Sequence, residues 1–224
     1  MYTYWKGEDP MMLANLEFDG ANSVILNTYT PRTRVALLTV CSWAKPYSQS
    51  HIHRAIRQDL MTTGPKGGLL NQIDYIHLSS AGVIPHACEK WYPFTAYDWN
   101  NARVDTEALT EALEVYIAER LMRFVKRFES HYSHWVTYFR GNSTTSKAIL
   151  RVQEQLPLTR SQPYIGSPAE VIWRNVFVSS RISADMTVRE SLLSGYCDPD
   201  VALTLPDNLD QLQATLKEVL DVQE

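Results

Sequence analysis

The chain has 224 residues, of which 45% are apolar and 21% are charged. This composition is typical of a globular protein with a buried core and excludes a disordered or fibrous chain. The net charge of −4 excludes nucleic-acid binding driven by overall positive charge. No apolar run approaches the roughly 18 residues that a membrane-spanning helix needs, so no membrane partner is expected.

The cysteines and the N-terminal residues predict a cytoplasmic protein. Cys41, Cys88 and Cys197 form an odd set at wide spacings, which favours free thiols over a disulfide framework or a zinc site. Residues 1–10 lack the basic-then-apolar order of a signal peptide, so export is not expected. From residue 206 onward, five acidic residues accompany one lysine, and this acidic tail accounts for the whole net charge.

Strand and helix patterns alternate in the first half of the chain. Residues 34–40 form a continuous apolar, β-branched run that is typical of a strand buried on both faces. A helix is expected over residues 50–61, with Ser48 or Ser50 as its N-cap and a glycine-rich loop after it. Residues 73–79 predict a second strand, whose small polar end is expected to lead into a functional loop.

The second half is dominated by a long helix. Apolar residues recur at helical spacing from Leu109 to Phe128, and the helix is expected to begin near Asp105 or Thr106. The further elements expected are a strand over 135–140, a helix over 144–155, either a helix or a strand over 171–179, and a short amphipathic helix over 208–222.

This alternation predicts the α/β class, with a three-layer α/β/α architecture and a mainly parallel central sheet. A single domain is expected over residues 1–224. It would comprise an N-terminal extension (1–33), a core that carries the motifs (34–140), and a C-terminal completion of helices and strand with the acidic tail (141–224).

Candidate site residues follow the ends of the predicted strands. Ligands of open α/β sheets bind beyond the carboxyl ends of the strands, where neighbouring loops meet. The expected catalytic residues are Asp98, Lys45 and His53. The expected substrate-binding residues are Cys41, Ser42, Tyr47, Ser50, Ser79, Ser80, Tyr92 and Tyr97.

The loop after the first strand offers a cation and an aromatic ring. Pro46 disfavours the α region for Lys45, so the lysine is expected in an extended loop, where it can reach a phosphate or polarise a carbonyl. An ordinary exposed lysine is the alternative. Tyr47 offers a face for stacking a base, although packing is the commoner use of such a tyrosine.

The start of the following helix offers an anion site. Ser50 and His53 are three residues apart and can face one side, beside N–H groups suited to an anion. In the alternative, Ser50 is only a cap and His53 is partly exposed. His51 and His53 do not share a helical face, so no metal pair is expected there.

Asp98 and Cys41 are the other candidates for chemistry. Asp98 lies between Tyr97 and Trp99, an apolar setting that would raise the pKa of the carboxyl and suit it to activating water or stabilising a developing cation. An Asp that caps a turn is the alternative. Cys41 would be an activated thiol if it faced a helix N-terminus, and an inert buried thiol otherwise. Neither a cofactor nor a metal is expected.

A basic stripe on the long helix is the candidate nucleic-acid surface. Arg120, Arg123 and Arg127 lie close together with Lys126 and can track a phosphate backbone. A solvated helix face is the alternative.

The spacing Cys41-x-x-x-Lys45-Pro46-Tyr47-x-x-Ser50-x-x-His53 resembles the signature of the catalytic module of archaeosine synthases, which modify a 7-deazaguanine base in transfer RNA. Val40 stands where that pattern usually has proline. The segments 79–85 and 92–98 also look like that module, so the resemblance spans about residues 34–140.

The module in turn resembles the uracil-DNA glycosylase superfamily, which implies a three-layer α/β/α fold with a Pro-Tyr loop after the first core strand. Lys45 stands where those enzymes carry an acidic residue, which leaves Asp98 as the expected water-activating group. Archaeosine synthases also resemble multidomain proteins with a transglycosylase-like region and an RNA-binding domain, for which 224 residues leave no room.

The resulting hypothesis is a DNA glycosylase that flips a modified base out of DNA and hydrolyses its glycosidic bond, as in defence against phages with modified genomes. Nucleic acid is the expected partner, with DNA favoured over transfer RNA. The alternative is a transferase that adds an amine such as lysine to a 7-deazaguanine base. A catalytically inactive module that binds modified nucleic acid is a third possibility.

Overall fold

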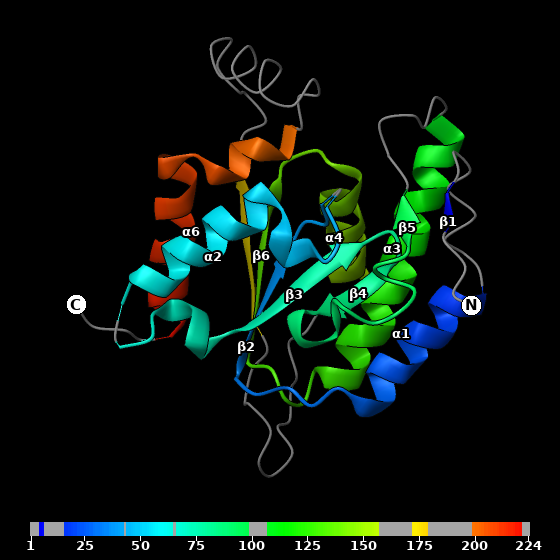
Figure 1. The fold of residues 1–224 in the computed structure, drawn as a ribbon, viewed down its shortest axis with the longest axis horizontal. Coiled ribbons are helices and arrows are strands. Elements are labelled where there is room, and N and C mark those ends of the chain that lie inside the picture. Colours follow the sequence, from blue (N-terminus) through cyan, green and yellow to red (C-terminus); the bar gives the residue numbers. More distant parts are fainter. Residues whose placement is uncertain are drawn as a thin grey trace.

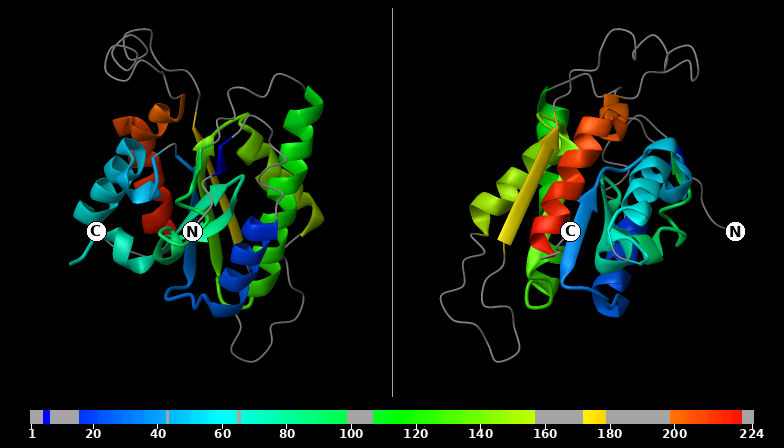
Figure 2. Two further views of the ribbon diagram at one scale, coloured as in Figure 1. Left: turned by 45° about the vertical axis from the view of Figure 1, so that its right-hand side comes forward. Right: turned by 90° about the vertical axis from the view of Figure 1, so that its left-hand side faces the viewer.

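A five-stranded sheet lies between two layers of helices (Figures 1 and 2). The computed structural model describes residues 5–6, 16–42, 44–64, 66–98, 107–156, 172–178 and 199–220, and of residues 5, 6, 98 and 199 it describes the backbone only. No helix within these ranges combines the length and the apolar character that crossing a lipid bilayer requires.

The sheet is mixed and mostly parallel, with the strand order β4-β3-β2-β6-β7. Its strands are β2 (Val35–Thr39), β3 (Asp74–Ser79), β4 (Gly82–Pro85), β6 (His134–Arg140) and β7 (Ile172–Val178). Of these five described strands, β4 alone runs antiparallel, paired with β3. The chain leaves central β2 toward β3 and later returns to the other side of β2 with β6. The loops after β2 and β6 therefore begin at the point where the strand order reverses, which is the ligand-binding position in such sheets.

Within the described ranges, five helices form the outer layers: α1 (Leu16–Thr28), α2 (His51–Thr62), α3 (Glu107–Phe128), α4 (Thr144–Gln155) and α6 (Pro206–Val219). Helices α2 and α6 cover one face of the sheet, and α1, α3 and α4 cover the other (Figures 1 and 2). The α/β class and the mainly parallel sheet predicted from the alternation of elements are confirmed.

The predicted elements agree closely with these bounds. The segment 171–179, which fitted a helix or a strand, contains β7, because its apolar residues pack beside β6. Two features differ from expectation. The small polar end of β3 leads through a tight turn into β4 and not into a long loop, and the segment 1–33 contains α1, which packs against β4.

Asn22 explains how α1 is held to the β3–β4 turn. Its side-chain amide donates to the carbonyl oxygens of Phe18 and Ala81, and its amide oxygen accepts from the N–H of Val83. Gly82, at φ +150°, lies against this amide so closely that a Cβ would overlap it. A short polar residue in mid-helix therefore replaces an apolar contact here, which is why the helical pattern of α1 is weak in the sequence.

Gly82→Ala is expected to lower the free energy of unfolding by about 1–3 kcal/mol, because alanine rarely adopts this φ and its methyl group would displace Asn22. Urea denaturation measures the change. Gly20→Ala is the matched control. Beyond the neighbouring residues and backbone of α1, no described atom lies within 4 Å of the added Cβ, so stability is expected to rise by up to about 1 kcal/mol. Equal losses in both variants would contradict this explanation.

Candidate active site

The loops that follow β2, β3 and β4 meet through a chain of hydroxyl groups. Tyr47 lies in the 3-10 turn after β2, Ser79 ends β3, and Tyr97 lies in the short strand β5 (Tyr97–Asp98). The Tyr97 hydroxyl lies 2.7 Å from that of Tyr47 and 2.8 Å from that of Ser79. All three residues are buried, so these hydrogen bonds fix the three loops relative to one another.

Lys45 lies over this hydroxyl chain. Its Nζ is 4.9 Å from the centroid of the Tyr47 ring and 4.5 Å from that of the Tyr97 ring, and it donates to the Ser42 carbonyl oxygen at 2.5 Å. Cation–π attraction and this hydrogen bond hold the ammonium group at the carboxyl end of β2. Lys45 is only half-buried. It therefore presents a fixed positive charge that solvent and a ligand can reach.

A group of aromatic and imidazole rings lies beneath Tyr47. Tyr75, His77 and Ser79 alternate along β3 and so share one face of the sheet, the face that α2 covers. His53, from α2, packs edge-on against the His77 ring at 4.5 Å, and its Nδ1 lies 2.9 Å from the Tyr75 hydroxyl. The Tyr47 ring lies 4.7 Å from the His77 ring.

Burial determines the charge state of these groups. It lowers the pKa of His77 to about 4 and, together with the neighbouring His77, lowers the pKa of His53 well below its ordinary value. Both imidazoles are therefore neutral at pH 7. Burial also raises the pKa of Tyr47 and that of Tyr97, so both hydroxyls stay protonated and available as hydrogen-bond donors.

Glu89 joins the Tyr47 turn to the segment after β4. One carboxylate oxygen accepts from the Ser48 N–H at 2.9 Å and the other from the Ser48 hydroxyl at 2.5 Å. Imidazole nitrogens of His77 and His86 lie 3.4 and 3.3 Å from the same two oxygens. Burial alone would raise the pKa of the Glu89 carboxyl, but the two imidazoles and Ser48 outweigh it and keep the pKa well below its ordinary value. Glu89 is therefore a buried carboxylate.

The other residues expected after β2 take mostly structural positions. Ser50, and not Ser48, caps α2 by accepting from the His53 N–H at 3.1 Å. The Ser42 hydroxyl donates to the Ala44 carbonyl oxygen at 3.1 Å. Cys41 is a half-buried cysteine outside any disulfide of the described residues.

His53 is fully buried. The alternative in which His53 is partly exposed is therefore wrong. The lack of exposed surface on His53 also does not fit direct contact with a phosphate in this conformation. The position favours a role in holding Tyr75 and His77.

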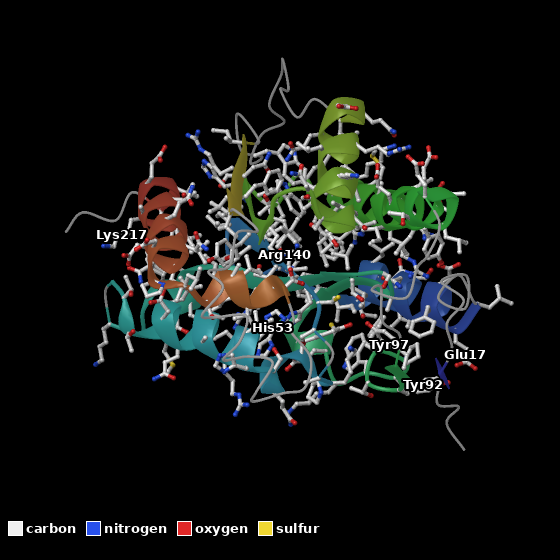
Figure 3. All side chains as sticks on the ribbon, turned by 90° about the horizontal axis from the view of Figure 1, so that it is seen from above. Glu17, His53, Tyr92, Tyr97, Arg140 and Lys217 are labelled. Atoms are coloured by element: carbon white, nitrogen blue, oxygen red, sulfur yellow. The ribbon has the colours of Figure 1, made fainter. Side chains whose placement is uncertain are left out.

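Tyr92 and Asp98 differ in how they relate to this cluster. The Tyr92 hydroxyl donates to Glu17 of α1, and Tyr92 lies to one side of Tyr97 (Figure 3). Tyr92 is therefore attached to α1. The Asp98 backbone directly follows Tyr97 and pairs with Lys6 of β1 (Trp5–Lys6), whereas its side chain, like Trp99, lies outside the described residues.

The predicted basic stripe is not a continuous surface. Arg120 is only 3% exposed and donates to the carbonyl oxygen of buried Ser80 at 2.6 Å, so its assignment to nucleic-acid binding is wrong. Its guanidinium also pairs with Asp19 at 3.0 Å. The side chain of Arg123 is half-exposed and lies 3.7 Å from the same carboxylate, while Arg127 donates to the Leu26 carbonyl oxygen. These arginines attach α3 to α1 and to the β3–β4 turn.

Sequence reasoning missed the cluster formed by Tyr75, His77, His86 and Glu89. His77 alternates with Tyr75 and Ser79 along the predicted strand 73–79. This spacing indicates that the three side chains share one face of the sheet. His86 and Glu89 are three residues apart, a spacing that also indicates that their side chains can lie close together. Their meeting depends on the β3–β4 hairpin, which was not predicted.

Comparisons with known proteins identify a family without a described activity. The family model described as "Domain of unknown function (DUF5591)" matches residues 21–167. No curated protein matches the chain. A solved structure described as "Crystal structure of AF0587, a protein of unknown function" is similar at 17% identity with a TM-score of 0.50. The alignment covers 89% of this chain and 49% of that one, so the chain spans about half of that protein, and the likeness concerns the fold.

Proposed function

This chain belongs to the DUF5591 family, and we propose that it is a DNA glycosylase-like enzyme that hydrolyses the N-glycosidic bond of a modified base. The observation that carries the proposal is the position of Lys45, whose ammonium group is held over Tyr47 and Tyr97. This charge lies where the strand order reverses, at the edge of the sheet at which α/β enzymes bind ligands.

The chemistry requires a stabilised leaving group. When the glycosidic bond breaks, its electron pair goes to the base, and the sugar becomes oxocarbenium-like. A fixed cation beside the base stabilises the negative charge that develops on its ring, and does so more strongly where water is partly excluded. In this proposal Lys45 supplies that cation, and the buried Tyr47 and Tyr97 rings hold its ammonium group in place.

A second group must deliver water to the sugar. Asp98 follows Tyr97 directly in β5, so the fixed hydroxyl chain brings its backbone to the same region as Lys45. We assign Asp98 the role of accepting the proton of the attacking water, whose hydroxyl then bonds to the sugar carbon. The buried rings of Tyr47 and His53 serve as positioning residues for the Lys45 loop.

Resemblance of the 41–53 motif to the archaeosine synthase module supports a base as the substrate. It also supports the alternative, transfer of an amine to a 7-deazaguanine base. The two reactions leave different products, because only the hydrolysis releases the base and leaves an abasic sugar.

The test is formation of abasic sites. The purified chain is incubated, with and without labelled lysine, with transfer RNA and with single-stranded and duplex DNAs that carry natural bases or 7-deazaguanine derivatives. The DNA products are then cleaved with alkali. Strand cleavage at a modified base supports the glycosylase. Labelled lysine retained on a nitrile-bearing base, without cleavage, supports the transferase. Intact, unlabelled DNA and transfer RNA throughout would overturn both.

A further inference from the structure

We propose that His77, His86 and Glu89 form a binding site for a divalent transition-metal cation, with Zn²⁺ as the ion that fits best. Two imidazoles and one carboxylate are a common donor set for such ions. One ligand atom from each of the three residues lies within 4.8 Å of the other two. The site goes beyond the proposed function and does not rest on it.

The distances fit shared coordination better than direct hydrogen bonds. His77 Nε2 lies 3.4 Å from one Glu89 oxygen, and His86 Nδ1 lies 3.3 Å from the other. An N–H···O hydrogen bond is usually about 2.7–3.2 Å long, and neither nitrogen has a hydrogen-bond partner among the described residues. Two ligands that each lie about 2.0–2.1 Å from one tetrahedral ion are about 3.3 Å apart.

An unpartnered imidazole in the interior needs an explanation. His77 is 0% exposed, and neither of its ring nitrogens has a hydrogen-bond partner in the part of the chain that the structure describes. A buried polar atom without a partner costs about 1–3 kcal/mol, so such atoms are rare in folded proteins. A cation bound by His77 Nε2 would satisfy one of the two nitrogens.

The surroundings provide support for the carboxylate and access for the ion. Ser48 donates both its N–H and its hydroxyl to Glu89, which orients the carboxylate as outer residues do in metal sites. The His86 side chain is one-third exposed, so an ion and its remaining water ligand can enter from that side. Cys88 lies between His86 and Glu89 in sequence, but its thiol is not among the clustered ligand atoms.

The position of the site suggests what the ion does. Glu89 is attached to Ser48, which directly follows Tyr47 in the turn after β2, and the His77 ring packs against the Tyr47 ring. An ion at this point would join β3, the segment after β4 and the Lys45–Tyr47 loop. We assign it a structural role, because it would hold these three segments together.

The test is metal binding by the full chain. Protein freed of metal with a chelator is titrated with Zn²⁺ by calorimetry and with Co²⁺ by visible absorption, which reports tetrahedral coordination. One ion per chain, with intense Co²⁺ bands, is expected. Absence of saturable binding of either ion by folded wild-type protein would overturn the proposal.

Variants identify the ligands. His86→Gln is expected to weaken Zn²⁺ binding at least tenfold and to remove the Co²⁺ bands, and its partial exposure makes it the variant least disruptive to the fold. Glu89→Gln should have the same effect, and Ser48→Ala a smaller one. His51→Gln is the matched control, because His51 is exposed on α2 and is not among the clustered residues. Wild-type affinity in folded His86→Gln protein, or equal loss in His51→Gln, would overturn the assignment.

Discussion

Lys45→Ala is expected to reduce the rate of base excision by about 10²–10³-fold in single-turnover experiments, which is the usual cost of removing one preorganised group that stabilises transition-state charge. The ammonium group held over the Tyr47 and Tyr97 rings would be lost, whereas both tyrosines would keep their mutual hydrogen bond. The effect should fall on the rate at saturating DNA more than on the affinity for DNA.

Lys66→Ala is the control for this prediction. Lys66 is an exposed lysine in the glycine-rich segment after α2, so its removal takes away the same formal charge without touching the site. Wild-type rates are expected for it. If Lys66→Ala slowed excision as much as Lys45→Ala, the effect would be one of overall charge. Thermal unfolding of both variants checks that the loss in Lys45→Ala does not come from unfolding.

Trp135→Ala is expected to lower the free energy of unfolding by about 3–5 kcal/mol, the usual cost of deleting a large buried ring. Trp135 is 0% exposed near the start of β6. Its ring lies 4.8 Å from that of Tyr132, 5.7 Å from that of Trp173 and 6.2 Å from that of Phe124. It therefore joins α3, β6 and β7, and its loss would leave a cavity between the sheet and the helical layer.

Calorimetry measures this effect as a fall in melting temperature of roughly 6–20 °C for a chain of this size. Trp91→Ala is the matched control, because Trp91 is 39% exposed and its removal creates no enclosed cavity. A fall of equal size in both variants would contradict the role of Trp135 as a core residue.

The parts of the fold that follow from local pattern were predicted well. The continuous apolar run of β2 and the helical spacing in α3 each identified an element, because burial of one face requires those periods. The β3–β4 hairpin was not predicted because Ser79 and Gly82 look like the start of a loop. What closes the turn is the Asn22 side chain from α1, a contact between residues about 60 positions apart.

The site was predicted only in part, because it too depends on contacts between residues far apart in the sequence. Sequence placed Lys45, Tyr47, Ser79 and Tyr97 in loops that share one edge of the sheet, and the hydroxyl chain brings three of them together. The burial of Arg120 and His53 could not be inferred from the sequence pattern. Arg120 and His53 have polar side chains at helix positions that suggested exposure, yet tertiary packing buries both against partners from β3 or the turn after it.

The most direct test of the base-binding site is a crystal structure of the chain with an oligonucleotide that contains a 2′-fluoro nucleoside of an excised base, which resists hydrolysis. The proposal predicts that this base lies outside the DNA stack, at the carboxyl end of β2, with one of its polar atoms within hydrogen-bonding distance of Lys45 Nζ. A base that remains stacked, or that binds along α3 away from Lys45, would contradict it.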